Sequence, residues 1–341
     1  GVYFLMSKYY DINRILSYKA QVSVIVGVRG YGKTYGFKKK GIRNFLDKGE
    51  QFVWVRRYKT ELVEVKKTFW DAIRNDKDLK KRYGELKYEV EGDKGLINGE
   101  VACFFIPLST SATYKSSDFP KVTMLVFDEF IIESGKTYYM QNELSMFYSL
   151  LETIQRDRYN VRAILIGNAI NFNNPYFIGW KIKPFKSEFL HLKDRSIVIQ
   201  MAKGDEFIRE KQKSNFGKLV RGTKYEEMAI HNKFIDDNDK FIAKKTDDAR
   251  YLCSVKYEDE EIAFWFDYTT GTMYANMLVD KQYNIKYSLS QLDHDINYYL
   301  VKNYKGTHLK TIIECYQLGV LYFSDLRVKG IVQEMMMLFG L

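Results

Sequence analysis

An octapeptide near the N-terminus, Gly27-Val28-Arg29-Gly30-Tyr31-Gly32-Lys33-Thr34, constrains this chain more than any other feature. It fits the pattern G-x-x-x-x-G-K-[S/T] at every fixed position and follows the apolar run 22–26. In such a loop the glycines let successive backbone N–H groups face phosphate, the lysine reaches the outer phosphate oxygens, and the hydroxyl ligates Mg²⁺ at a helix N-terminus. The sequence therefore predicts that this loop binds ATP with Mg²⁺, the alternative being an ordinary glycine turn.

Composition sets wider limits. The chain has 341 residues, of which 46% are hydrophobic, so it can bury a full core and is long enough for two domains. Its net charge of +10 suits an anionic polymer as partner, although solvated basic faces are an equal alternative. The apolar runs are too short to span a membrane. Cys103, Cys253 and Cys315 are widely scattered, which favours neither a disulfide framework nor a zinc site.

The first half of the chain alternates between helical and strand patterns. Helical spacing follows the loop and ends at Gly49, a residue typical of a helix C-cap. Short, continuously apolar segments at 51–55, 101–106, 122–127 and 161–166 are typical of strands buried on both faces, with an amphipathic helix from Asn142 before the last of them. We therefore predict an α/β fold with a mostly parallel sheet and the ligand at the carboxyl ends of its strands.

The pattern changes beyond residue 190. A charge-dense segment, 203–227, indicates helix and linker, and three short strands at 250–256, 262–267 and 272–279 then predict an antiparallel meander. Helical spacing resumes after Leu289. We predict an ATPase domain at 6–190, a linker with a helix at 191–235, and a smaller α+β domain at 236–341.

Two adjacent carboxylates end the apolar run Met124-Leu125-Val126-Phe127-Asp128-Glu129, the form of a Walker B element. We expect Asp128 to hold Mg²⁺ and Glu129 to act as the general base that polarises the attacking water. A strand that ends in acids is common, so the prediction depends on the phosphate loop upstream.

Three further residues are candidates for contact with the γ-phosphate. Asn168 follows the strand at 161–166 and is expected to sense the γ-phosphate or the lytic water, the alternative being a structural turn. Arg156 ends the preceding helix, where it could reach a neighbouring subunit's phosphate in a ring or simply be solvated. Lys115 precedes the Walker B strand and is a second candidate at the subunit boundary.

The arginine-containing loop, the strand Phe52-Val53-Trp54-Val55-Arg56-Arg57, the segment Val126-Phe127-Asp128-Glu129 and the segment Leu165-Ile166-Gly167-Asn168 resemble those of the DNA-packaging ATPases of small, protein-primed tailed phages. The likeness covers roughly residues 7–190. It implies an ASCE-type P-loop fold and nucleotide contacts from the whole loop. It also implies that Arg156 acts as a finger in trans and that Lys115 assists across the same interface.

The same resemblance implies a biological setting: a homomeric ring, usually of five subunits, docked on the portal of an empty capsid in the host cytoplasm. Such a ring translocates double-stranded DNA, in some phages with a packaging RNA. Arg57, Lys59 and Lys66 would then face the channel and contact DNA phosphates, solvation being the alternative.

The last third of the chain resembles the ribonuclease-H-like nuclease domain of terminases. Asp267 ends a candidate strand, but residues 301–313 hold no acid, so the domain is expected to be vestigial. The alternatives are a complete terminase with an active nuclease and a P-loop switch protein that is no motor.

Overall fold

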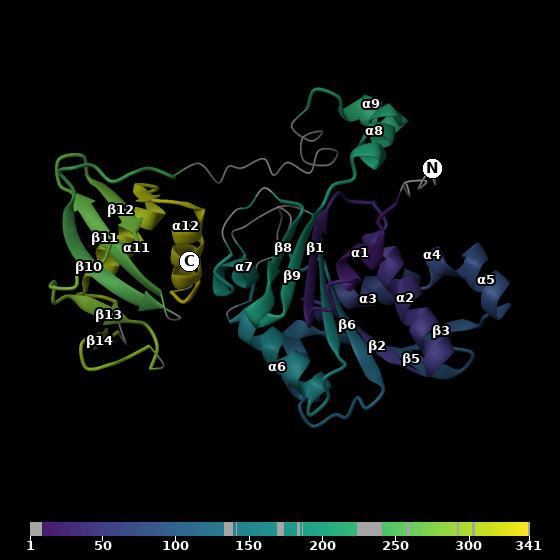
Figure 1. The fold of residues 1–341 in the computed structure, drawn as a ribbon. Helices are drawn as coiled ribbons and strands as arrows, with labels where there is room; N and C mark the ends of the chain where they lie inside the picture. The colour runs from purple at the N-terminus through teal and green to yellow at the C-terminus, as the bar shows by residue number, and fades with distance from the viewer. Residues whose placement is uncertain are drawn as a thin grey trace. The chain divides into compact units, whose positions relative to one another are not determined.

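The computed structural model describes residues 9–132, 139–140, 142–168, 174–182, 185, 187–223, 241–257, 260–291, 293–301 and 304–339. The chain divides into two compact units, one formed by residues 1–171 and 184–234 and the other by residues 172–183 and 235–341. Figure 1 follows the chain through both. Among the described residues, no helix combines the length and the apolar character that a membrane crossing requires.

The first unit is built on a nine-stranded sheet of order β3-β4-β5-β2-β6-β7-β1-β9-β8. The six strands β5, β2, β6, β7, β1 and β9 are parallel to one another. At the edges of the sheet, β4 pairs antiparallel with β5 and β3, and β8 pairs antiparallel with β9. The strands are β1 (Val22–Gly27), β2 (Gln51–Arg56), β3 (Tyr88–Glu91), β4 (Lys94–Ile97), β5 (Glu100–Pro107), β6 (Val122–Asp128), β7 (Arg162–Gly167), β8 (Phe189–Leu192) and β9 (Ile197–Ala202). The predicted α/β fold with a mostly parallel sheet is confirmed.

Helices connect these strands, as expected where parallel strands need crossovers. They are α1 (Ile12–Leu16), α2 (Lys33–Lys48), α3 (Lys59–Thr68), α4 (Asp71–Arg74), α5 (Lys77–Tyr83), α6 (Glu143–Gln155), α8 (Asp205–Lys213) and α9 (Asn215–Val220), with 3₁₀ turns η1 (Leu108–Tyr114) and η2 (Lys193–Arg195). Helix α2 ends at Gly49 as predicted: φ is +70°, the Gly49 N–H donates to the Phe45 carbonyl, and the following Glu50 N–H donates to the Asn44 carbonyl.

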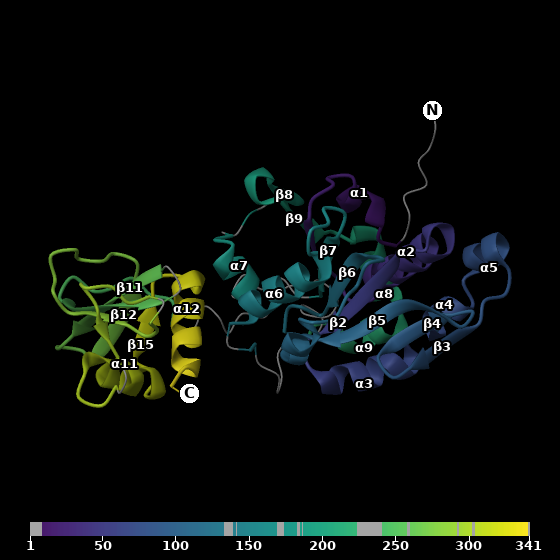
Figure 2. The ribbon, with the colours of Figure 1, turned by 90° about the horizontal axis from the view of Figure 1, so that it is seen from below.

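Strands buried on both faces explain the continuous apolar runs. In β2, Phe52 and Trp54 belong to a core cluster with residues of α2 and α3, while Val53 and Val55, also fully buried, point to the opposite face because side chains alternate along a strand. Figure 2 shows α3 and α4 near β3. The junction of the two helices packs on this strand, since Trp70 lies 5.2 Å from Tyr88 between ring centroids and its indole N–H donates to the Glu89 carbonyl.

The predicted domain boundary at residue 190 is wrong. Strand β9 pairs with β1 inside the first sheet and is buried along its whole length, and β8 pairs with β9. The run Ile197–Ala202 is apolar except at Gln200 and belongs to the core. Helices α8 and α9 follow it, so a helical linker begins near residue 205. Residues 172–183, assigned to the ATPase domain, cluster with the second unit.

The second unit holds a six-stranded sheet of order β14-β13-β10-β11-β12-β15. The predicted meander is present as β10, β11 and β12, joined between the last two by a turn at 268–271, and β13 and β15 pair in parallel with its outer strands. The elements are α7 (Pro175–Gly179), β10 (Arg250–Tyr257), β11 (Glu260–Asp267), β12 (Thr272–Asn276), β13 (Lys286–Ser288), β14 (Tyr299–Leu300), α11 (His308–Gln317), β15 (Leu321–Phe323) and α12 (Leu326–Met337). This is the smaller α+β domain. The three cysteines are free and buried.

Candidate nucleotide-binding site

The phosphate loop lies between the end of β1 and the first turn of α2. Gly30 and Gly32 have φ values of +83° and +93°, a region that L-residues rarely adopt, which explains why the pattern needs glycine at position 32. Gly30 occupies one of the variable positions of the pattern. Lys33 is buried, and its Nζ donates to the carbonyls of Gly27 and Val28 at 2.8 Å each. The loop therefore gathers backbone N–H groups, a helix N-terminus and one cation in the arrangement that binds phosphate.

The Walker B acids lie beside this loop. Register places Asp128 of β6 next to Ile166 of β7, and Gly167 of β7 next to Val26 of β1, so these strands end at one edge of the sheet. As a result the Thr34 hydroxyl donates to Oδ1 of Asp128 at 3.0 Å. Burial raises the pKa of Asp128, and Arg56 and the Thr34 hydrogen bond oppose that rise. The two predicted motifs thus meet in one site.

Arg56, at the end of β2, contacts both acids. Its Nη1 is hydrogen-bonded to Oε2 of Glu129, and its Nη2 lies 3.5 Å from Oδ2 of Asp128. Glu129 has φ of +60°, and its side chain is about half exposed, so the carboxylate is held by the arginine at the mouth of the site. Arg56 was not predicted from the sequence as a site residue. Its position at the end of the strand beside β6 is the signal that could have identified it.

Asn168 follows β7 at the same edge of the sheet and is half-buried. The backbone after the Walker B acids passes close to it, because the Phe130 N–H donates to the Ile166 carbonyl and a Cβ on Gly167 would lie 3.1 Å from the Phe130 ring. The structure therefore places Asn168 beside the acids, where a γ-phosphate sensor is expected.

Arg156 contacts the loop that carries Lys115, in another part of the unit. It ends α6, and its Nη2 donates to the Ser117 carbonyl at 2.9 Å, with Nη1 3.7 Å from Oδ1 of Asp118. Lys115 precedes Ser117 by two residues, and the side chains of Arg156 and Lys115 are both exposed.

Helix α8, which lies in the segment predicted as helix and linker, packs directly on the phosphate loop. The Phe207 ring lies 5.6 Å from the Tyr31 ring and 6.1 Å from the Tyr9 ring, between centroids. Lys211 Nζ donates to the carbonyl of Arg29, whose own side chain is exposed. Tyr31 is thus a packing residue of the loop.

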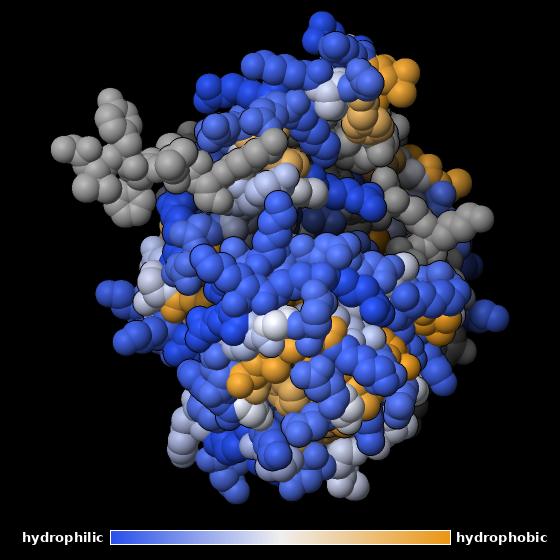
Figure 3. All heavy atoms as spheres, turned by 90° about the vertical axis from the view of Figure 1, so that its right-hand side faces the viewer, coloured by the Kyte–Doolittle hydropathy of each residue, from blue (hydrophilic) through white to orange (hydrophobic). Residues whose placement is uncertain are grey.

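The three residues predicted to contact DNA differ in their surroundings. Arg57 is buried, and its guanidinium forms a bidentate pair with Glu143 at 2.8 and 2.9 Å, so the predicted DNA contact of Arg57 is wrong. Lys59 begins α3 and is exposed. Lys66 is partly buried and pairs with Asp93 at 2.9 Å. The molecular face in Figure 3 is mainly hydrophilic, with small separate hydrophobic patches.

In the second unit, Asp267 has a structural environment. Its carboxylate accepts hydrogen bonds from the Thr246 hydroxyl and from the N–H groups of Thr269 and Thr270, which stabilises the turn between β11 and β12. The Thr246 hydrogen bond is the main cause of its lowered pKa. Among the described residues, no group of three or more His, Cys, Asp or Glu side chains is placed to hold a metal.

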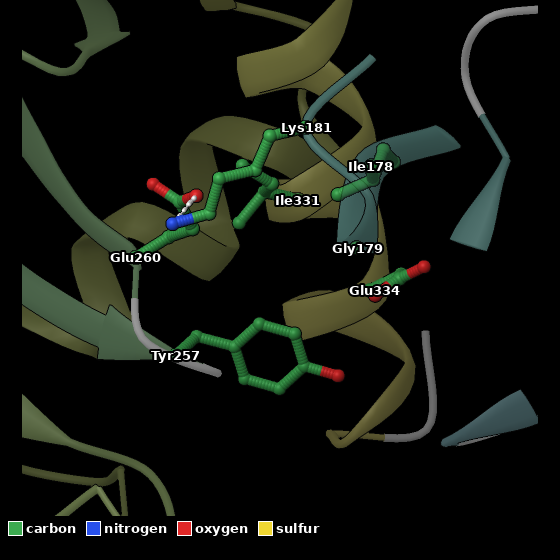
Figure 4. A pocket seen from close by; sticks show the side chains of 7 residues that line it. All are labelled: Ile178, Gly179, Lys181, Tyr257, Glu260, Ile331 and Glu334. Atoms are coloured by element: carbon green, nitrogen blue, oxygen red, sulfur yellow. Dashed lines mark ion pairs between the residues drawn. The ribbon is translucent and has the colours of Figure 1, made fainter. Parts of the chain in front are cut away.

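A small cavity of about 80 Å³ lies in the second unit (Figure 4). Figure 4 shows Lys181 extending toward Glu260, with which it forms an ion pair at 3.5 Å, above the ring of Tyr257. Ligand pockets usually measure several hundred Å³, so this cavity is too small for a nucleotide.

Fold and site together define a P-loop ATPase in which the phosphate loop and the Walker B acids meet at the carboxyl edge of a parallel sheet. Over residues 5–339 the chain matches the family described as podovirus DNA encapsidation protein (Gp16), and it belongs to that family.

The relatives agree over nearly the whole chain. The DNA packaging proteins of Bacillus phages phi29 and PZA are each 33% identical over 330 residues, covering 96% of this chain and 97% of theirs. The solved phi29 viral genome packaging motor assembly is similar with a TM-score of 0.72 and 33% identity, covering 97% of this chain and 99% of that one. The N-terminal domain of the phi29 DNA packaging ATPase matches with a TM-score of 0.52 and 34% identity, covering 59% of this chain and all of that domain.

Because Gly32 requires φ of +93° at the start of α2, Gly32→Ala should strain the loop and lower nucleotide affinity about tenfold, the equivalent of about 1.4 kcal/mol. Titration with a fluorescent ATP analogue measures this. Gly49→Ala is the matched control, since Gly49 has φ of +70° at the other end of the same helix with no atom near its missing Cβ. The control should lose similar stability and keep its affinity; equal affinity losses would contradict the assignment.

Proposed function

We propose that this chain couples ATP hydrolysis to translocation of double-stranded DNA into a viral procapsid. The observation that carries the proposal is the contact of Thr34 with Asp128, which joins a phosphate loop to a pair of acids in a member of a DNA encapsidation family. The dedicated second acid, Glu129, supports hydrolysis as well as binding, because a nucleotide switch needs no general base there.

The residues present suit Mg²⁺. The Thr34 hydroxyl and the Asp128 carboxylate, 3.0 Å apart, are hard oxygen ligands of the kind that this ion prefers. When bound between these residues and the nucleotide, Mg²⁺ would neutralise phosphate charge. Lys33 would bind the phosphate oxygens after leaving the carbonyls of Gly27 and Val28.

Glu129 would act as the general base for the attacking water. Its carboxylate accepts a hydrogen bond from Arg56, so activation should turn the carboxylate from Arg56 toward the attacking water. Asn168 would hydrogen-bond the γ-phosphate or the water at the same edge of the sheet.

Arg156 and Lys115 would complete a neighbouring subunit's site. Both are exposed, and Arg156 donates a hydrogen bond to the loop that carries Lys115. This assignment implies a homomeric ring, and likeness to a viral genome packaging motor assembly supports it. We propose five subunits, docked on the procapsid portal in the host cytoplasm, as the resemblance of the sequence to packaging ATPases implies. A packaging RNA between motor and portal is part of the same proposal, and the second unit would serve docking as a vestigial nuclease domain.

DNA contacts would come from the exposed start of α3. Lys59 is available for phosphate contact, and Lys66 would have to exchange its pair with Asp93 for one with DNA.

The direct test is steady-state ATP hydrolysis by the purified protein with and without double-stranded DNA. We expect DNA to stimulate hydrolysis and Lys33→Ala to abolish it. Rates that do not respond to DNA would contradict a motor and favour a nucleotide switch, and undiminished hydrolysis by Lys33→Ala would reject the site.

Action in trans predicts complementation. Arg156→Ala should lower kcat by about 10³-fold, the usual worth of an arginine finger, and Lys33→Ala should be inactive. When the two variants are mixed, the Lys33→Ala subunits can supply Arg156 to intact sites of their neighbours, so hydrolysis should recover. A mixture as inactive as its components would show that Arg156 acts within its own subunit or has no catalytic role.

Arg56 should also set the pH range of activity. Burial raises the pKa of Asp128 and Arg56 opposes this, so removing the guanidinium in Arg56→Gln should raise that pKa further. Because metal binding needs the ionised carboxylate, the acid limb of log kcat/KM for ATP should move to higher pH. Arg14→Gln removes an exposed arginine paired with Glu188 and should leave the limb in place; an unmoved limb in Arg56→Gln would contradict the prediction.

A further inference from the structure

We propose that the buried pair Arg57–Glu143 is a positioning device that fixes helix α6, and with it Arg156, relative to the catalytic acids of the same subunit. The inference rests on the proposed function, in which Arg156 acts on a neighbour. Neither Arg57 nor Glu143 is proposed to contact nucleotide. They act through the helix that carries the finger.

The pair holds the first turn of α6. Glu143 is the first residue of the helix, and its two carboxylate oxygens accept from Nε and Nη2 of Arg57 at 2.8 and 2.9 Å. The same carboxylate accepts from the Met140 N–H at 2.9 Å, which fixes the chain entering the helix. Both charged side chains are almost fully buried, at 2% and 0% exposure, so water does not compete for these bonds.

Arg57 also binds the backbone at the Walker B acids. Its Nη2 donates to the Phe130 carbonyl at 2.5 Å, and its Nη1 lies 3.4 Å from the carbonyl of Glu129. The guanidinium stacks over the rings of Phe127 and Tyr139, at 5.6 and 5.0 Å from their centroids. The planar guanidinium of Arg57 therefore joins the start of α6 to the backbone of the general base. Arginine can do this because its five N–H donors are held in a rigid planar group, which lysine lacks.

Helix α6 transmits this placement to its other end. Its inward face, formed by Phe147, Leu150, Leu151 and Ile154, is buried, so the helix moves as a body with the unit's core. Arg156 follows its last turn and donates to the Ser117 carbonyl. The same loop is tied to β2 at its start, since the Ser109 N–H donates to the Arg57 carbonyl at 2.9 Å. Arg57 thus anchors both the helix and the loop between which Arg156 lies.

Two adjacent residues at the end of β2 are consequently connected to two different nucleotide sites. Arg56 holds the carboxylates of Asp128 and Glu129, which act on the subunit's own nucleotide. Arg57 holds the helix whose far end would act on the neighbour's nucleotide. A shift at the end of β2 would reach both sites together.

The complementation described above allows a test of position apart from chemistry. In that mixture the Lys33→Ala subunits supply Arg156 and are the donors, and the Arg156→Ala subunits are the acceptors. The donor receives a second substitution, Glu143→Gln, which keeps the side chain's shape but removes its charge. Mixed with Arg156→Ala acceptors, this donor should rescue hydrolysis about 100-fold less well than Lys33→Ala alone, since misplacement by about 1 Å costs that much. Nucleotide affinity of Glu143→Gln in an otherwise unchanged chain should stay normal.

Asp76→Asn in the same donor is the matched control. Asp76 is also a buried carboxylate in an ion pair, with Lys39 at 2.8 Å, but it lies on α5 and touches neither α6 nor its loop. It should donate the finger normally. If Glu143→Gln does not fold, Arg57→Lys, which keeps the charge but loses the fork, replaces it and should show the same defect.

The outcomes separate the two levels of inference. No rescue by the Lys33→Ala donor itself would overturn the trans-acting finger of the proposed function, on which this inference rests. Normal rescue by that donor and equally good rescue by the Glu143→Gln or Arg57→Lys donor would overturn the positioning role alone. A defect shared equally by the Asp76→Asn donor would show that loss of stability, and not position, is responsible.

Discussion

The hydrogen bond from Thr34 to Asp128 requires that strands β1, β7 and β6 lie side by side in parallel and end together. The two motifs are separated by more than ninety residues of chain, and only this pairing brings them within 3.0 Å. Each of these strands is buried on both faces, so a shift of one residue in their pairing would still leave the apolar side chains buried. The register is therefore fixed by the close packing of side chains of different size and not by their exclusion from water. The site is therefore a product of the whole sheet.

Much of this was readable from sequence. Continuous apolar runs predicted the central strands, and the phosphate-loop pattern predicted the loop that joins β1 to α2, in which Gly30 and Gly32 have positive φ. Strand β9 was missed because Gln200 interrupts its apolar run; in the fold its side chain is buried and accepts a hydrogen bond from the Tyr10 hydroxyl. A polar residue satisfied by a partner 190 positions away leaves no local signal.

Arg56 and Arg57 show a second limit of sequence reading. They are chemically identical neighbours, and a basic cluster suggests a surface for DNA. Because they end a strand in the middle of the sheet, their side chains leave in different directions, one to the Walker B acids and the other into a buried pair with Glu143. Glu143 lies 86 residues away, and only the fold decides which basic residues remain exposed.

The packing of α8 on the phosphate loop bears on where this protein can be divided. Gly204 lies against the Tyr31 ring at 3.4 Å from its missing Cβ, and Phe207 covers Gly30. A fragment that stops at the end of β9 would bare these aromatic rings and remove the lysine that binds the Arg29 carbonyl. An isolated ATPase unit that retains native nucleotide binding should consequently extend through α9. The helical segment that leads to the second unit is thus also part of the nucleotide site.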